Sequence, residues 1–575
     1  MGFGTKWLTW IRQCISSVKF SILINRSPCG FFSSYRGLRQ GDPLSPFLFI
    51  LAMEGLNNLF QTAKVKGWIR GFQVGNNTRN NLEITHLQYA DDTLVFCFAV
   101  GEQMLILRVI FNIFEAVSGL HINWSKSFIY PVNTVINIED LANTLGGKVG
   151  ELPTTYLGMP LGSKSKSKEI WSGVIEKCER KLANWKCQYL SSGGRLTLVN
   201  SVLDALPSYM MSLFPIPAKV TKRLDAIRRN FLWQGSEDKR KYHLVKWEEL
   251  LVSKRGGGLN IRKLKTQNKS LMMKWLWKFV SPEVSLWKEV IIEKYGMEDK
   301  WMTEVVTNPY NCSVWRSIRN LWQLVKERTS CKVGNGEKVA FWNDILCGQE
   351  ALKHAFPVLH SLSQGQEATV AELWTGQGWN LVLRRGLNDW EMTTIARFHD
   401  TMQMATNLTG EEDRLVWKGE RGGEFIVKSA YRELRSTEEQ HAGWPWRMIW
   451  RTEIPYKVNY FTWLLAKQAV LTHENLNKRK PNLRSSCYLC EEQVETVNHL
   501  FLHCKWTDQL WQMFIQKRKI KWTKPGSIIE VLQCWNRDGN AGKNEKRWRI
   551  VPACIWWTIW KERNQRCFEG KQNNI

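Results

Sequence analysis

Two neighbouring carboxylates, Asp91 and Asp92, are the residues of this 575-residue chain whose types first suggest a site for divalent cations. They lie between an alternating segment, Leu82–Gln88, and a run rich in β-forming residues, Thr93–Cys97. The pattern predicts a β-hairpin with the acids at or near its tight turn. Asp is also a favoured turn residue, so such a pair by itself is more often only a solvated turn. On a rigid hairpin the two carboxylates would suit Mg²⁺, and two such ions would serve nucleotidyl transfer.

Thiols and an imidazole near the other end of the chain form a second group with ligand chemistry. The spacing C-x2-C-x8-H-x4-C within 18 residues is typical of a closed tetrahedral zinc site, and its ligands are Cys487, Cys490, His499 and Cys504. His503 is the alternative ligand, although we expect it to point elsewhere. The competing interpretation is that these are four incidental residues in a chain with 14 cysteines.

The segment upstream of the paired acids predicts a ligand-binding turn followed by a buried helix. Asp42 is expected to cap this helix, with Pro43 in its first position. Gly41, just before them, would let a ligand approach the backbone closely. The apolar residues that follow recur at helical spacing, and they are Leu44, Phe47, Leu48, Leu51, Ala52 and Leu56.

Four motifs in this order resemble the palm of a reverse transcriptase from plant non-LTR (LINE-type) retrotransposons. They are Arg39–Pro46, Tyr89–Asp92, Ser118–Ser127 and Leu152–Gly162. The segment around Cys487–Cys504 resembles the zinc-binding domain that follows such enzymes. The resemblance covers most of the chain and is sharpest at the palm and zinc motifs.

The resemblance implies roles for individual residues of the palm. Asp91 would be a metal ligand, with Asp92 beside it as a ligand or as electrostatic support. Gln40 and Gly41 would border the incoming nucleotide. The remaining substrate contacts would be Arg39 at the phosphates, Tyr89 next to the primer end, and Lys126 at the leaving pyrophosphate. A surface arginine, an ordinary strand aromatic and an exposed lysine are the alternatives for these last three.

The family match also bears on the beginning of the chain. Residues Gly2–Val18 resemble sequence that follows the first palm strand, which carries another catalytic aspartate in the family. We therefore expect an N-terminally truncated palm that is inactive as an isolated chain.

Charge points to a polyanionic partner. The net charge is +27, and Lys219–Lys278 holds 17 Lys and Arg against 5 Asp and Glu, a net +12. Lys239–Lys241 form a cluster of cations within it, expected to contact phosphates without sequence choice. No apolar run is long enough to span a bilayer, and no secretory signal is present, so we expect a nuclear or cytoplasmic protein without membrane contact.

These observations predict an α+β fold of several domains. We expect part of a right-hand palm over residues 1–163, a basic helical thumb-like region over 164–300, a mixed connection region over 301–440, a zinc-binding domain over 441–530 and a tail over 531–575. The cofactors would be Mg²⁺ in the palm and structural Zn²⁺. The partners would be an RNA template, a DNA primer and deoxynucleoside triphosphates.

Two other functions remain open from the sequence. One is a non-catalytic nucleic-acid-binding remnant with a structural zinc site. The other is a group II intron maturase or telomerase-like polymerase, which the zinc motif argues against.

Overall fold

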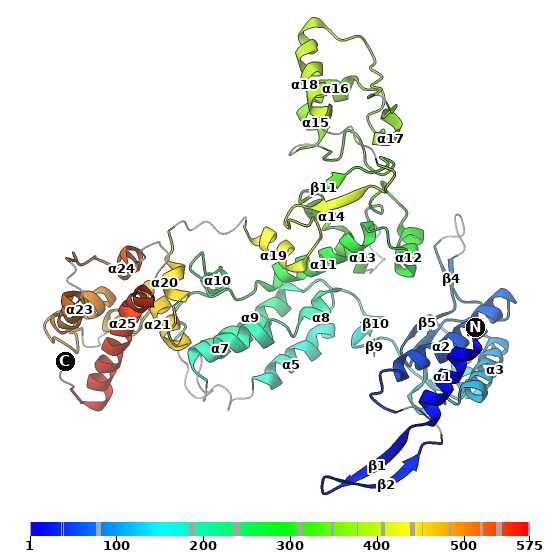
Figure 1. The fold of residues 1–575 in the computed structure, drawn as a ribbon, viewed down its shortest axis with the longest axis horizontal. Helices are drawn as coiled ribbons and strands as arrows, with labels where there is room; N and C mark the ends of the chain where they lie inside the picture. Colours follow the sequence, from blue (N-terminus) through cyan, green and yellow to red (C-terminus); the bar gives the residue numbers. More distant parts are fainter. Residues whose placement is uncertain are drawn as a thin grey trace. The chain divides into compact units, whose positions relative to one another are not determined.

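The residues described by the computed structural model form two compact units, coloured along the chain in Figure 1. The first unit comprises Met1–Tyr156 and Leu286–Tyr295, and the second comprises Leu157–Ser285 and Gly296–Ile575. The described residues are 2–35, 37, 39–75, 82–182, 190–233, 242–307, 314–346, 350–376, 378–403, 409–436, 443–450, 452–481, 485–517, 521–535 and 543–572.

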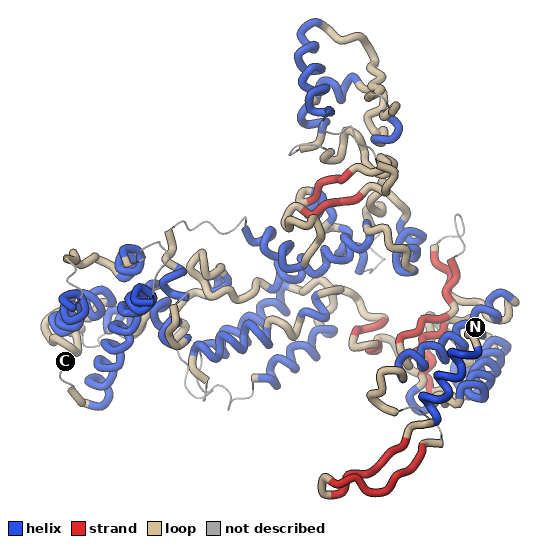
Figure 2. Tube along the Cα trace, viewed as in Figure 1, coloured by secondary structure: helices blue, strands red, loops and turns tan. Residues whose placement is uncertain are grey.

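The first unit combines helices with short strands (Figure 2). Its helices are α1 (Thr5–Ser16), α2 (Ser45–Val65), α3 (Gly101–Ser118), η1 (Trp124–Lys126), α4 (Ile138–Leu145) and α12 (Leu286–Tyr295). Its strands are β1 (Lys19–Ile24), β2 (Ser27–Ser33), β3 (Phe72–Val74), β4 (Leu82–Ile84), β5 (His86–Tyr89), β6 (Asp92–Val95), β7 (Phe128–Ile129), β8 (Lys148–Val149) and β9 (Thr154–Tyr156).

The core of the first unit lies between α2, α3 and α4. Buried apolar residues recur at helical spacing along α2 at Leu56, Phe60 and Ala63, and they pack against Phe111 and Phe114 of α3. The described strands form only two-stranded pairs, including the antiparallel pairs β3–β4 and β5–β6. Helices with small sheets are consistent with the expected α+β class.

The second unit is mostly helical (Figure 2). Its helices up to residue 326 are η2 (Glu169–Trp171), α5 (Ser172–Lys181), α7 (Ser192–Leu198), η3 (Val199–Leu203), α8 (Ser208–Met211), α9 (Ala218–Trp233), α10 (Trp247–Leu251), α11 (Leu264–Val280), α13 (Val314–Arg319) and α14 (Trp322–Lys326). Those that follow are α15 (Leu352–Ala355), α16 (Pro357–Leu362), α17 (Val370–Leu373), η4 (Asp389–Glu391), α18 (Met392–Gln403), α19 (Val427–Ser436), α20 (Trp446–Trp450), α21 (Tyr456–Ala466), α22 (His473–Asn477), η5 (His499–His503), α23 (Lys505–Lys517), α24 (Ile528–Cys534) and α25 (Lys543–Glu569). Its strands are β10 (Met159–Leu161), β11 (Thr329–Lys332) and β12 (Arg414–Trp417).

One apolar core joins the basic helices of the second unit to its C-terminal part. It runs from Leu196 and Phe231 to Trp463, Trp511 and Trp556, all nearly inaccessible to solvent. Segments more than 200 residues apart therefore fold as one body. None of the described helices is long and apolar enough to cross a membrane.

The helix after the ligand-binding turn begins later than its sequence predicts. Asp42 was expected as the cap and Pro43 as the first helical residue, but α2 starts at Ser45 and has Pro46 in its first turn. The Asp42 carboxylate instead accepts a hydrogen bond from the Leu44 N–H at 2.9 Å. This two-residue reach forms a local turn that competes with helix capping, which explains the shift.

Candidate functional site

The paired carboxylates lie at a tight hairpin turn, as the sequence predicts. Strands β5 and β6 pair antiparallel with Tyr89 opposite Asp92, which leaves Ala90 and Asp91 as the two turn residues. Ala90 has a φ of +52°, a left-handed conformation that costs free energy in a residue with a Cβ. Asp91, Asp92 and Tyr89 are all exposed. The turn therefore presents both acids to solvent on a fixed backbone.

Helix α2 positions this hairpin through the first residue of β5. The His86 ring stacks on Phe60 at a centroid distance of 4.6 Å, and its Nε2 lies 3.0 Å from Asn57 Oδ1. Burial, aided by the nearby Lys64 charge, lowers the pKa of His86, so the ring is neutral and joins the apolar core. Sequence reasoning missed both His86 and Asn57, and the position of His86 in the strand leading to the acids was the available signal.

Tyr156 is a further residue that lies near the acids. Burial and the negative charge of Asp92 raise the pKa of its hydroxyl. Its motif was noticed in the sequence, but Tyr156 was not singled out within it.

The other expected palm residues lie on separate segments of the first unit. Arg39, Gln40 and Gly41 form an exposed turn before α2, where Gly41 has a φ of +83° and the Arg39 carbonyl accepts from Ser45 Oγ at 2.9 Å. Lys126 is exposed at the end of η1. None of these four residues has a hydrogen bond or ion pair with Asp91 or Asp92 in the described structure.

The ligand set around the hairpin contains two acids only. Across the described residues, no third carboxylate, imidazole or thiol joins Asp91 and Asp92 in a cluster able to hold a metal ion. Mg²⁺ takes about six oxygen ligands, several of them water when protein carboxylates are few. The pair therefore fits a weak, largely hydrated site.

The cysteine and histidine motif, in contrast, folds into a compact ligand cluster. One ligand atom each from Cys487, Cys490, His499 and Cys504 lies within 4.8 Å of the others. Cys487 and Cys504 are fully buried, and Cys490 Sγ is 3.3 Å from His499 Nε2. Three thiols and one imidazole converging at this distance fit a tetrahedral zinc ion.

A backbone turn forms the first half of the cluster. The Leu489 N–H donates to Cys487 Sγ at 3.4 Å, and the Glu491 N–H donates to the Cys487 carbonyl at 2.8 Å. Glu491 has a φ of +59°, which closes the turn. The Leu489 N–H favours a thiolate at this sulfur, although larger effects raise the pKa of Cys487 overall.

A π-helical turn forms the second half. The sequence predicts a short helical turn between His499 and Cys504, and the structure gives η5, in which the Cys504 N–H donates to the His499 carbonyl at 2.7 Å. Five residues of α-helix would turn these side chains about 140° apart, because each residue advances about 100°. The wider π turn brings both to one side. His503, the alternative ligand, is exposed and outside the cluster.

The four ligand side chains also share hydrogen bonds that shift their pKa values. The hydrogen bond to Cys504, with burial second, raises the pKa of Cys487 to about 12, and that hydrogen bond lowers the pKa of Cys504. Hydrogen bonding to Cys487 raises the pKa of His499, whose Nδ1 is buried without a hydrogen-bond partner among the described residues. Zinc would replace these shared protons.

Helix α25 holds the cluster from outside the motif. Its Arg563 reaches the fully buried Glu495, whose Oε1 also accepts from the His473 N–H at 3.0 Å. Arg566 donates to the Leu489 carbonyl at 3.3 Å. Helix α25, in the segment expected as a tail, thus contacts residues around the ligand cluster.

The basic segment Lys219–Lys278 divides into buried and exposed cations. Arg228 is 2% exposed and pairs with the buried Asp204, so it is part of the core. Arg229 and Lys246 lie at the surface or half-buried, without an ion pair in the described structure. Lys239–Lys241 lie outside the described residues.

Two protein families match different parts of the chain. Residues 1–161 match the family described as reverse transcriptase (RNA-dependent DNA polymerase). Residues 425–511 match the family described as zinc-binding in reverse transcriptase, and this range holds all four zinc-type ligands.

Three relatives come from Arabidopsis thaliana. A protein named after ribonuclease H is 29% identical over 419 residues, which cover 70% of this chain and 65% of the relative. Two uncharacterised mitochondrial proteins are 49% identical over 71 residues and 30% identical over 142 residues, covering 12% and 24% of this chain and 56% and 91% of those proteins. The chain spans less than two thirds of the first two relatives.

Proposed function

The chain belongs to the reverse transcriptase family of retroelements, and we propose that it is the RNA-directed DNA polymerase part of a plant non-LTR (LINE-type) retrotransposon. The observation that carries the proposal is the exposed hairpin turn with Asp91 and Asp92, held by α2 and preceded in the chain by the Arg39–Gly41 turn. Template RNA, primer DNA and deoxynucleoside triphosphates would be its substrates, in the nucleus or the cytoplasm.

Different palm residues would bind the metal and the incoming nucleotide during nucleotidyl transfer. Asp91 and Asp92 would hold Mg²⁺, which when bound supplies positive charge to the attacking hydroxyl and to the phosphates. Gln40 and Gly41 would border the incoming nucleotide, where the left-handed Gly41 keeps the backbone accessible.

The remaining polar residues would contact the triphosphate, the leaving pyrophosphate and the primer end. Arg39 would contact the triphosphate, and Lys126 would neutralise or protonate the leaving pyrophosphate. Tyr89, exposed beside the turn, would lie next to the primer end.

The isolated chain is proposed to be a poor polymerase. Two-metal transfer needs carboxylates from more than one strand, and the described residues bring only Asp91 and Asp92 together. The attacking hydroxyl would then not be fixed in line. A nucleic-acid-binding protein with a structural zinc site is the second candidate, favoured by the basic segment and the compact ligand cluster.

Primer extension tests the proposal. A purified chain with RNA template, DNA primer and Mg²⁺ should extend no faster than its Asp91→Ala variant. It should nevertheless bind the primer–template, and the nucleotide complementary to the template should slow its dissociation in wild type but not in Arg39→Ala. Equal dissociation with matched and mismatched nucleotides would favour the second candidate. Mg²⁺-dependent extension abolished by Asp91→Ala would show that another carboxylate completes the site.

A further inference from the structure

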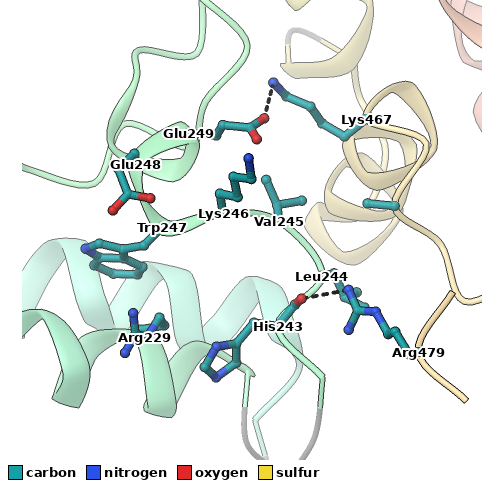
Figure 3. Close-up of a pocket in the computed structure, with 11 residues that line it drawn as sticks. Arg229, His243, Leu244, Val245, Lys246, Trp247, Glu248, Glu249, Lys467 and Arg479 are labelled. Atoms are coloured by element: carbon teal, nitrogen blue, oxygen red, sulfur yellow. Dashed lines mark hydrogen bonds and ion pairs between the residues drawn. The ribbon is translucent and has the colours of Figure 1, made fainter. Parts of the chain in front are cut away.

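A cavity of about 540 Å³ in the second unit is distinct from both ligand groups (Figure 3). Three segments line it: the end of α9 at Arg229, residues 243–249, and, more than 200 residues later in the sequence, Lys467, Ala469 and Arg479. Its volume lies in the range of small-ligand sites, about 300–1,000 Å³. The cavity thus joins a basic helix to the segment that precedes the zinc motif.

Cations converge on this cavity from all three segments. Arg229, Lys246, Arg479 and Lys467 line it, against Glu248 and Glu249. Lys467 is 3.1 Å from Glu249, an ion pair visible in Figure 3. The other three cations have no carboxylate partner in the described structure. Like charges gathered in this way repel one another unless an anion binds among them.

Arg479 is held in place by contacts to groups other than carboxylates among the described residues. Arg479 donates to the His243 carbonyl at 2.9 Å and stacks on the Tyr242 ring at 5.0 Å. Among the described residues, the Nε atom of Arg229 and the indole N–H of Trp247 are buried without a hydrogen-bond partner.

His243 also lines the cavity, beside two of these cations. Burial lowers the pKa of this imidazole, and the charges of Arg229 and Arg479 lower it further. The lowered pKa of His243 agrees with an excess of positive charge from these two arginines.

We propose that this cavity binds a phosphodiester group of a nucleic-acid strand. Arginine forks and a lysine suit phosphate oxygens, while Leu244 and Ala469 in the lining give an apolar surface for the adjoining sugar or base. Arg229 and Lys246 belong to the basic segment, so a strand on that surface would enter the cavity directly. The inference rests on the proposed function only in expecting a nucleic-acid partner.

Fluorescence anisotropy on the full chain tests the proposal with a labelled 12-nucleotide oligouridine and a labelled 12-nucleotide oligothymidine. The Arg229→Gln/Arg479→Gln variant should weaken binding about tenfold or more, because two charge-assisted contacts are lost. Its matched control is Arg384→Gln/Arg397→Gln, which removes two exposed arginines elsewhere in the second unit and should change binding less than threefold.

A single substitution, Lys246→Gln, tests the cavity even if the double variant fails to fold. Lys246 is exposed and has no partner in the described structure, so Lys246→Gln should not alter folding. It should lower the slope of log affinity against log salt by about 1. Lys332→Gln, an exposed lysine in β11, is its control and should leave the slope unchanged.

Each outcome decides for or against the cavity. Equal losses in cavity and control variants, or equal competition by polyglutamate, would overturn the proposal. Inorganic phosphate that competes at millimolar concentration in wild type but not in Arg229→Gln/Arg479→Gln would support it, and a preference between the RNA and DNA probes would identify the strand. Selective loss of binding in the cavity variants, together with equal dissociation for matched and mismatched nucleotides, would sustain the cavity while refuting the polymerase. Slower dissociation with the matched nucleotide, without selective loss of binding in the cavity variants, would do the reverse.

Discussion

Arg563 and Glu495 form an ion pair at 2.8 Å with both side chains almost fully buried, 68 residues apart in sequence. Glu495 follows the first half of the zinc-type cluster, and Arg563 belongs to the final helix. The Arg563 guanidinium also stacks on Tyr488 and Trp560 at 5.1 and 5.4 Å. This ion pair ties α25 to the residues around the ligand cluster.

Removing one charge of this pair should destabilise the second unit. Glu495→Gln leaves the buried Arg563 charge uncompensated, which costs about 3–5 kcal/mol. Glu492→Gln, which removes an exposed partner of Lys505, should cost less than about 1 kcal/mol. Urea denaturation followed by tryptophan fluorescence measures both. Equal midpoints for the two variants would show that the buried pair does not hold α25.

Zinc content should follow the four clustered ligands. We expect one Zn²⁺ per chain by elemental analysis, lost in His499→Ala and kept in His503→Ala, because only the first side chain lies in the cluster. A chelator should lower the melting temperature of wild type, since metal binding is coupled to folding. Cys534→Ser, at an exposed thiol, controls for general loss of cysteine. Zinc retained by His499→Ala would reject this ligand set.

Asp413 should be the most sensitive acid of the β11–β12 region. Its buried carboxylate accepts from four backbone N–H groups at 2.7–3.2 Å, those of Gly334, Gly336, Lys338 and Val339. Asp413→Ala would leave these four N–H groups without an acceptor and should lower the free energy of unfolding by about 3 kcal/mol or more. Glu412→Ala next to it loses only an exposed pair with Lys338 and should cost less than about 1 kcal/mol. Hydrogen exchange of β11 amides is the local measurement, and unchanged protection in Asp413→Ala would contradict the expectation.

Two glycines should respond oppositely to alanine. A Cβ on Gly258 would lie 2.1 Å from the Val252 carbonyl oxygen, whereas one on Gly173 in α5 would meet nothing within 4 Å. Gly258→Ala must therefore shift the backbone and destabilise the fold. Gly173→Ala should stabilise α5 by up to about 1 kcal/mol, because alanine loses less backbone entropy in a helix. Thermal melting compares the two, and a neutral Gly258→Ala would mean that the loop relaxes freely.

The sequence by itself determined the local features. Turn-forming acids between β-forming runs predicted the hairpin at Asp91 and Asp92. The C-x2-C-x8-H-x4-C spacing predicted the ligand cluster at Cys487–Cys504. These patterns act over a few residues, where backbone preference and side-chain chemistry suffice.

Tertiary structure decided everything that depends on long-range packing. The sequence could not show that Arg228 is a core residue, that Arg563 closes the zinc module, or that Arg229 and Arg479 meet at one cavity. It also placed the start of α2 too early, because the Asp42 carboxylate binds a neighbouring N–H instead of capping a helix. The sequence gives the charge and spacing of residues directly. The partner of a buried charge depends on the tertiary packing that removes both groups from water.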